Sequence, residues 1–208
     1  GMLMAQPFHE LQALPLPLLR DNVDTDQIIP SREMKSTGKT GLADGLFAGW
    51  RYLGASGRDP DPAFVLNDPR YRDSHVILAG RNFGCGSSHE HAVWALAEYG
   101  FRAIIAESFA PIFAGNCVRN GIVPIVLDKA AIAHIAAGEA PVTIRLDEQD
   151  VTAADGQRGT FAIDGEAKAM LREGLDAIDL TLLQSSGIAD WQARDRAARP
   201  WIYLENRA

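Results

Sequence analysis

The chain has 208 residues, of which 47% are hydrophobic and 23% charged, and a formal net charge of −7. This is the composition of an ordinary globular protein, which excludes a chain that is disordered throughout. The net negative charge and the lack of a block of basic residues argue against a nucleic-acid-binding surface. We expect a single domain over residues 1–208.

Two cysteines, Cys85 and Cys117, are too few to form a disulfide framework. They are also too few to hold an iron–sulfur cluster by themselves, since such clusters take about four thiolate ligands. No apolar run approaches the roughly 20 residues that cross a bilayer, and the first residues carry no secretory signal pattern. We therefore expect a cytoplasmic protein with no membrane association, whose own residues bind no metal or other cofactor.

The first quarter of the chain has little periodicity. Asp and Asn crowd residues 21–26, and their side chains favour turns because they bond nearby backbone groups. A calcium loop of the EF-hand type is the less favoured alternative, because the required glycine and later glutamate are missing. The glycine-rich stretch over 31–61 is long enough to predict a functional loop.

The middle of the chain alternates apolar runs with segments of helical spacing. Their strand–helix–strand–helix–strand order predicts parallel strands joined by right-handed crossovers. Ser87, followed three residues later by Glu90, is a capping-box pattern that marks a helix start. The predicted strands are 75–79, 102–106 and 122–127, and the predicted helices are 87–99 and 108–119.

The last part of the chain changes character. Segments 142–146 and 160–163 flank the turn signal Asp155-Gly156 and predict two antiparallel strands. The expected fold class is α/β, with a parallel βαβαβ core and additional antiparallel strands. A helical C-terminal tail over 163–208 completes it, with helices at 164–173 and 181–199.

The segment from Gly84 to His91 carries most of the potential chemistry. It joins a predicted strand to a predicted helix, which is where parallel α/β sheets bind ligands. Glycines let the backbone approach a ligand, and the free N–H groups at a helix start bind anions. A well-capped helix behind a tight glycine turn is the alternative that requires no chemistry.

Several known motifs do not fit this segment. It lacks the lysine that a Walker phosphate loop needs, and its glycine spacing matches neither a dinucleotide fingerprint nor a nucleophile elbow. His89 and His91 are two residues apart and would diverge on a helix, which argues against a metal site. Cys85 beside a helix start is a conceivable nucleophile, although a packing role is favoured. What remains is an anion-binding turn that presents Ser87 and Ser88.

Three stretches together form a long and specific pattern: Asp21–Pro30, Gly80–Ala92, and Ser108–Phe113 with Asn116-Cys117 and Asn120-Gly121. Through these stretches the sequence resembles the small-subunit family of the 3-isopropylmalate dehydratases, in the aconitase superfamily. The resemblance implies a swivelling β/β/α domain that completes the active site of a larger partner subunit. It also implies a heterodimer or higher assembly in which the partner, rather than this chain, holds a [4Fe-4S] cluster.

The reaction that the resemblance implies is the isomerisation of 2-isopropylmalate to 3-isopropylmalate through 2-isopropylmaleate, in leucine biosynthesis. By the same resemblance, Ser87 is the base that removes a proton from the dicarboxylate substrate. Substrate contacts are expected from the turn and from the loop after the first motif, at Gly86, Ser88, His89, Arg32, Met34 and Lys35.

Two positions depart from the family pattern. His89 stands where the family has an arginine that binds a substrate carboxylate, and Val93 stands at a proline position. Histidine has fewer donors than arginine and is only partly charged near neutral pH. The alternatives are a paralogous hydro-lyase subunit for another small branched or unsaturated diacid, and a non-catalytic anion-binding module. An independent serine or cysteine hydrolase would be active without a partner.

Overall fold

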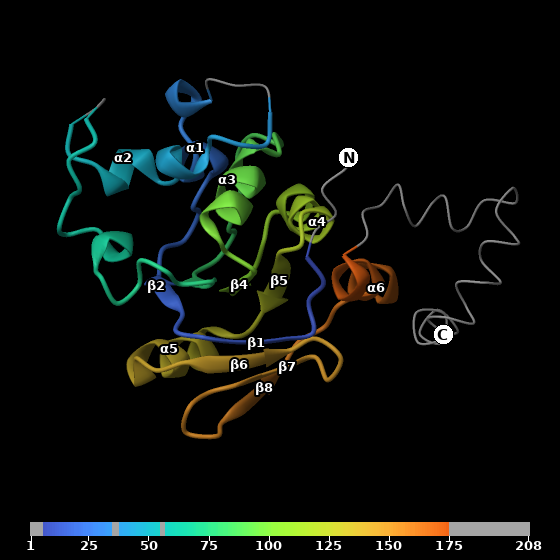
Figure 1. The fold of residues 1–208 in the computed structure, drawn as a ribbon. Coiled ribbons are helices and arrows are strands. Elements are labelled where there is room, and N and C mark those ends of the chain that lie inside the picture. Colours follow the sequence, from blue (N-terminus) through green and yellow to red (C-terminus); the bar gives the residue numbers. More distant parts are fainter. Residues whose placement is uncertain (1–5, 35–37, 55–56, 175–208) are drawn as a thin grey trace, which may run out of the picture.

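A computed structural model describes residues 6–34, 38–54 and 57–174. Within these residues, two four-stranded sheets form the frame of the molecule (Figure 1). The parallel sheet has the order β2-β3-β4-β5, and the antiparallel sheet has the order β1-β6-β7-β8. The strands are β1 Glu10–Ala13, β2 Leu16–Leu18, β3 Val76–Ala79, β4 Ala103–Ala106, β5 Val123–Val126, β6 Val142–Arg145, β7 Asp150–Thr152 and β8 Arg158–Thr160.

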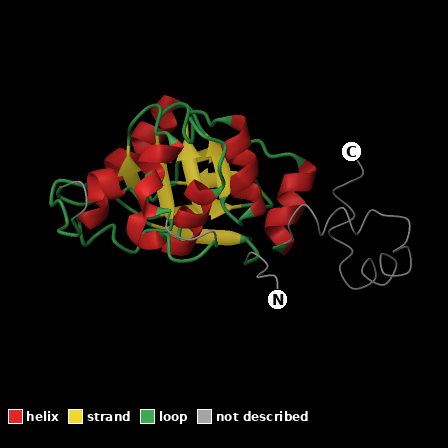
Figure 2. Ribbon diagram, turned by 90° about the horizontal axis from the view of Figure 1, so that it is seen from above, coloured by secondary structure: helices red, strands yellow, loops and turns green. Residues whose placement is uncertain are grey.

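Helices lie around the strands when the molecule is seen from above (Figure 2). Each described helix is too short or too polar to cross a bilayer. The α-helices are α1 Thr25–Ile28, α2 Ala48–Arg51, α3 His91–Tyr99, α4 Pro111–Arg119, α5 Lys129–Gly138 and α6 Gly165–Glu173. Single 3-10 turns form η1 Ser31–Glu33, η2 Ala43–Gly45 and η3 Val65–Asn67.

The parallel sheet is buried on both faces. On β3, Ile77 packs into a core shared with α3 and α4, whereas Val76 and Leu78 pack into a second core. Successive strand side chains point to opposite faces, so a strand covered on both sides is apolar throughout. The second core is shared with α5 and the antiparallel sheet. The layers are therefore sheet, sheet and helices, which confirms the expected β/β/α fold class.

Several predicted elements are confirmed. The three middle strands are β3, β4 and β5, and they pair in parallel as expected. Helix α3 ends at Tyr99, and the N–H of Gly100, at φ 122°, donates to the carbonyls of Leu96 and Ala97. Helix α6 begins after Asp164, whose side chain caps it by accepting from the N–H of Ala167.

Both middle helices begin later than predicted. Helix α3 begins at His91 rather than at Ser87, and the predicted capping box is wrong, because Glu90 is the N-cap residue and makes no side-chain cap bond. Helix α4 begins at Pro111 rather than at residue 108. In both cases the backbone just before the helix is held by neighbouring segments, which prevents the helix from extending back.

The C-terminal strands also differ from the prediction. Asp155-Gly156 does lie in a hairpin, and this hairpin joins β7 to β8. The strand predicted over 160–163 is instead β8, which spans Arg158–Thr160. Helix α5 and strands β1, β2 and β7 were not predicted. The three strands have only three or four residues each, which gives little alternation to recognise. The predicted helix 181–199 lies outside the described residues, and the single domain over 1–208 stays a prediction.

A buried carboxylate ties the antiparallel sheet together. Asp150 has no exposed surface, and it accepts hydrogen bonds from Arg145 (Nε at 3.0 Å, Nη2 at 2.6 Å) and from Nε of Arg158 at 2.6 Å. The hydrogen bonds from the Arg145 guanidinium hold the pKa of Asp150 below its usual value. Because the two arginines lie on β6 and β8, the acid on β7 links all three strands.

Asp150→Asn should lower the free energy of unfolding by about 1–3 kcal/mol, because hydrogen bonds to a charged group are lost in a buried position. Urea unfolding followed by circular dichroism measures the change. The matched control is Asp68→Asn, which removes a partly exposed acid whose ion pair is with the exposed Arg70 and should change stability little. Equal effects of the two substitutions would contradict the role given to Asp150.

The same network should make the free energy of unfolding depend on pH in the acidic range. The pKa of Asp150 is lower in the folded chain than in the unfolded chain, so its contribution is fully present above the unfolded pKa of about 3.9. That contribution is lost as pH falls further, through the folded pKa. Below about pH 4, the unfolding free energy of the wild type should therefore fall more steeply than that of Asp150→Asn. Parallel pH profiles would count against this assignment.

Candidate active site

The turn over residues 80–86 is held on one side by residues 20–25. This contact brings together the two stretches that carry the first parts of the family resemblance. Because the bonds alternate in direction along the two segments, they fix the path of the turn. The backbone hydrogen bonds are Gly80 N to Arg20 O (3.0 Å), Asn22 N to Arg81 O (2.8 Å), Gly84 N to Val23 O (2.8 Å) and Thr25 N to Cys85 O (2.8 Å).

The third stretch holds the turn from the other side. The N–H of Phe83 donates to the carbonyl of Ser108 at 3.1 Å, and the N–H of Ala110 donates to the carbonyl of Phe83 at 3.0 Å. The Ser108 hydroxyl accepts from the N–H of Asn82 at 2.8 Å. These bonds keep residues 108–110 extended, which explains why α4 starts at Pro111.

Side chains of the first stretch reinforce this arrangement. Asp21 accepts from the N–H of Arg81 at 2.8 Å, and this backbone bond lowers the pKa of Asp21. Asn22 and Asn82, both at φ 56°, join their side chains at 3.0 Å. Asp24 forms a capping box with Gln27 at the start of α1. The prediction of a turn over 21–26 therefore holds only in part: Asp24 bonds locally as the cap of α1, which already includes residues 25 and 26, whereas Asp21 is held by Arg81 from the other segment.

Gly84 shows why glycine is needed in the turn. It has φ +83°, and a Cβ atom there would lie 2.0 Å from Cγ of Phe113. Phe113 in turn packs edge-on against Phe83, with ring centroids 5.5 Å apart. The turn therefore packs directly on Phe83 and Phe113, which belong to the core shared with α3 and α4, called the helix-side core below.

Ser87, Ser88 and His89 project from this turn and are exposed. Ser87 Oγ lies 2.6 Å from Nδ1 of His89 and also accepts from the N–H of His89 at 3.3 Å. Within the described part of the chain, the N–H groups of Gly86, Ser87 and Ser88 donate to no protein acceptor. The turn thus offers three backbone donors and the hydroxyls of Ser87 and Ser88 to an anionic ligand.

Residues of α4 brace the base of the turn, and the sequence analysis did not assign them this role. Buried Asn116 donates from Nδ2 to the carbonyl of Ser88 at 3.4 Å. Glu90 accepts from Arg119 at 3.1 Å and from Asn120 at 3.3 Å. The sequence did contain a sign of this role. Asn116 and Asn120 belong to the third matching stretch, and their spacing of four residues places them on one side of a helix.

The other predicted substrate contacts lie in the loop after α1. Arg32 is in η1, exposed, with its Nε 3.9 Å from the carboxylate of Glu33. Met34 is half-buried and packs against the helix-side core. Lys35 lies outside the described residues. The structure brings Gly86, Ser87, Ser88 and His89 together in one turn, whereas the roles of Arg32, Met34 and Lys35 stay predictions.

The two cysteines differ in environment. Cys117 is fully buried in α4, and burial raises the pKa of its thiol, which makes it a poor nucleophile and a poor metal ligand. Cys85 is half-buried in the turn, where its carbonyl accepts from Thr25. Among the described residues, no group of three or more His, Cys, Asp or Glu side chains could hold a metal ion.

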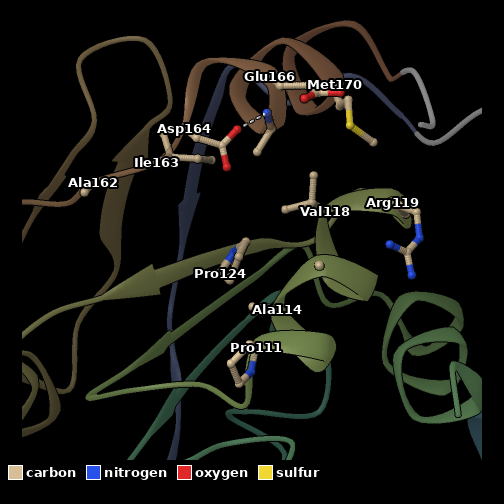
Figure 3. Close-up of a pocket in the computed structure, with 12 residues that line it drawn as sticks. Pro111, Ala114, Val118, Arg119, Pro124, Ala162, Ile163, Asp164, Glu166 and Met170 are labelled. Carbon is tan, nitrogen blue, oxygen red and sulfur yellow. Dashed lines mark hydrogen bonds between the residues drawn. The ribbon is translucent and has the colours of Figure 1, made fainter. Parts of the chain in front are cut away.

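A cavity of about 500 Å³ lies elsewhere, between α4, β5 and α6 (Figure 3). Its lining includes Val118, Pro124 and Met170, with the capping bond of Asp164 at one side. Ser87, Ser88 and His89 are not part of that lining. The described residues Gly86 to His89 are exposed, and an exposed turn needs a second surface to enclose a small ligand.

Comparisons with known proteins agree with this description. Residues 5–130 match the aconitase C-terminal domain family. The 3-isopropylmalate dehydratase small subunit of Cupriavidus necator is 52% identical over 206 residues, covering 96% of this chain and 99% of that protein. The small subunit of the same name from Polaromonas naphthalenivorans is 45% identical over 209 residues, covering 95% of this chain and 97% of that protein.

Among solved structures, the 3-isopropylmalate dehydratase of Methanocaldococcus jannaschii aligns with a TM-score of 0.65 and 29% sequence identity. The alignment covers 86% of this chain and 99% of that one. The layered fold, the turn held between two other segments and these near-full-length relatives agree with one another. The chain belongs to the 3-isopropylmalate dehydratase small-subunit family, within the proteins that carry the aconitase C-terminal domain.

Proposed function

We propose that this chain is the small subunit of a 3-isopropylmalate dehydratase. Together with a large subunit, it isomerises 2-isopropylmalate to 3-isopropylmalate through 2-isopropylmaleate, in leucine biosynthesis. The observation that carries the proposal is the 52% identity to the Cupriavidus necator small subunit over nearly the whole of both chains. The exposed turn supports it, since dehydration of a hydroxy diacid needs both a base and donors for carboxylates.

In this reaction a proton leaves the carbon next to a carboxylate, and hydroxide leaves the neighbouring carbon. Ser87 is the proposed base, and its hydroxyl is exposed at the tip of the turn. The N–H groups of Gly86, Ser87 and Ser88 are the proposed donors to a substrate carboxylate, whose negative charge they stabilise. Ser88 also keeps the turn in place through its carbonyl, which Asn116 binds.

The start of α3 contributes less to this chemistry than its sequence suggests. The dipole of a helix acts mainly within its first turn, and α3 begins four residues after Ser87. A free serine hydroxyl is a very weak base, and Ser87 must therefore be activated. Because α3 begins too far away, its positive end is a poor explanation for that activation. Within the described chain, the groups closest to Ser87 that could activate it are those of the turn itself.

We place the [4Fe-4S] cluster in the large subunit, where it would supply Lewis acidity toward the departing hydroxyl group. The described residues of this chain do not suit such a cluster. Cys117 is buried with a raised thiol pKa, and Cys85 has no neighbouring group of ligands. The part assigned to this chain is to bind carboxylate, orient the substrate and move the proton.

A second candidate substrate is another small branched or unsaturated diacid, handled by a paralogous hydro-lyase. The observation in its favour is His89, whose Nδ1 is taken up by Ser87. Only Nε2 is then left for a substrate carboxylate, whereas an arginine would offer a two-pronged contact. Comparing kcat/KM for 2-isopropylmalate and for related diacids in the complex separates the two candidates.

Ser87→Ala should lower kcat of the two-subunit complex by about 10²–10⁴-fold, because the proposed base is lost. Isomerisation of 2-isopropylmalate by the complex is the measurement, and size-exclusion chromatography checks that the subunits still associate. Thr160→Ala is the control, since it also removes an exposed hydroxyl, but on the distant strand β8. A Ser87→Ala complex that turns over at the wild-type rate would remove Ser87 from the mechanism.

The purified chain should neither bind iron in stoichiometric amount nor hydrate 2-isopropylmaleate, and adding the large subunit should restore hydration. The reason is that the turn is open and the described residues lack cluster ligands. Iron analysis, visible absorption and an activity assay with and without the partner measure this. Activity of the chain by itself would favour an independent hydrolase-like enzyme instead.

A further inference from the structure

We propose that His89 accepts the proton of the Ser87 hydroxyl, so that the two residues work as one base. The inference rests on the proposed function of the turn. Its basis is the distance of 2.6 Å between Ser87 Oγ and His89 Nδ1, which is that of a short, well-formed hydrogen bond. His89 acts through Ser87 rather than on the substrate, as the group that takes up the serine proton.

The bonds around Ser87 Oγ leave room for this role. The oxygen accepts from the N–H of His89 at 3.3 Å, and its own proton can point to Nδ1 when the ring carries its proton on Nε2. A hydroxyl oxygen has two lone pairs, so one remains. Since Ser87 is exposed, that lone pair can face a substrate held by the neighbouring N–H groups.

The proton transfers balance as follows. In dehydration the C–H bond of the substrate breaks, and its proton moves to Ser87 Oγ while the Oγ proton moves to His89 Nδ1. The electron pair of the C–H bond becomes the second bond of the alkene, and hydroxide leaves the neighbouring carbon with the C–O pair. In the hydration half, hydroxide adds to the alkene and the imidazolium returns its proton through Oγ to carbon. The isomerisation leaves both residues unchanged.

The groups around His89 leave its ring able to accept a proton. The His91 ring lies 6.2 Å away between centroids and nearly perpendicular. Glu90 is engaged by Arg119 and Asn120, and Asp24, which lies across the turn beside Gly86, caps α1. These two carboxylates therefore have other partners, and neither forms an ion pair with the imidazole in the described structure.

The identity of residue 89 changes how Ser87 is activated. An arginine at this position has no acceptor atom and stays protonated, so it cannot take the serine proton. A histidine can, which gives the departure from the family pattern a chemical meaning. The proposal thus accounts for the activation that the late start of α3 leaves unexplained.

The kinetic test compares His89→Ala with His89→Asn in the two-subunit complex. Asparagine places an acceptor oxygen near the position of Nδ1 and can hold the Ser87 hydroxyl, but it does not accept a proton. Both variants should lower kcat by about 10²-fold or more, with KM changed less than about threefold. Near-wild-type kcat in His89→Asn would reduce His89 to orienting Ser87, and a loss mainly in KM would make it a carboxylate ligand. Either result overturns the proposal.

The pH profile gives a readout that a structural role would not change. In the wild-type complex, kcat should fall as pH is lowered from about 8 to 6, since an imidazolium cannot accept the serine proton. The residual kcat of His89→Asn should lack this acid limb. An identical acid limb in both proteins would assign the titration to another group, His91 being the nearest, and would contradict the proposal.

A spectroscopic test separates this inference from the proposed function, because it needs no activity. In the full chain labelled with ¹⁵N-histidine, Ser87→Ala should shift the Nδ1 resonance of His89 toward that of a free acceptor nitrogen. His134, whose Nε2 lies 2.7 Å from Asp155, is the internal control and should not shift. No change at His89 means that the bond is absent and the proposal fails. An inactive wild-type complex with the bond present would instead refute the proposed function.

Discussion

The constraint on which this structure depends is the set of backbone hydrogen bonds that holds residues 80–86 between residues 20–25 and residues 108–110. A glycine-rich turn has many accessible conformations, and ordering it costs conformational entropy. Bonds from both sides offset that cost and leave one path for the chain. Gly84 adds a steric condition, because only glycine fits against Phe113 at that point. The exposed tip from Gly86 to His89 is therefore rigidly supported at its base, although it is open to solvent.

An open tip on a rigid base suits a subunit that completes another protein's site. In water the unpaired N–H groups of Gly86, Ser87 and Ser88 are solvated, so exposing them costs little. When a partner surface and a dicarboxylate exclude that water, the same donors become strong electrostatic groups. In the proposed function, the late start of α3 shifts the activation of Ser87 from the helix dipole to the turn itself, and the Ser87–His89 hydrogen bond is the contact best placed to provide it.

The rest of the fold supports this turn by burying the parallel sheet on both faces. The helix layer presses Phe113 and the start of α4 against the turn, while the antiparallel sheet covers the opposite face. Asp150 holds the antiparallel strands β6, β7 and β8 together through Arg145 and Arg158. Glu90 and Arg119 then connect α3 to α4 close to the site. Stability and site geometry are linked through these shared contacts.

The sequence by itself determined the parts of the protein whose signals are local. Strands β3 and β4 are apolar at every position because both faces are buried, and the helix predicted over 164–173 corresponds to α6. The long motif around Ser87 likewise predicted the family, which the relatives confirm, and it supplied the candidate site. Only the tertiary structure decided that Ser87 and Glu90 do not form a capping box. Thr25 holds Cys85, while Arg119 and Asn120 take the Glu90 carboxylate, and these contacts override the local preference. The pairing of Ser87 with His89 could not be read from the sequence either, because it depends on the backbone path between them, which contacts with distant segments help to fix.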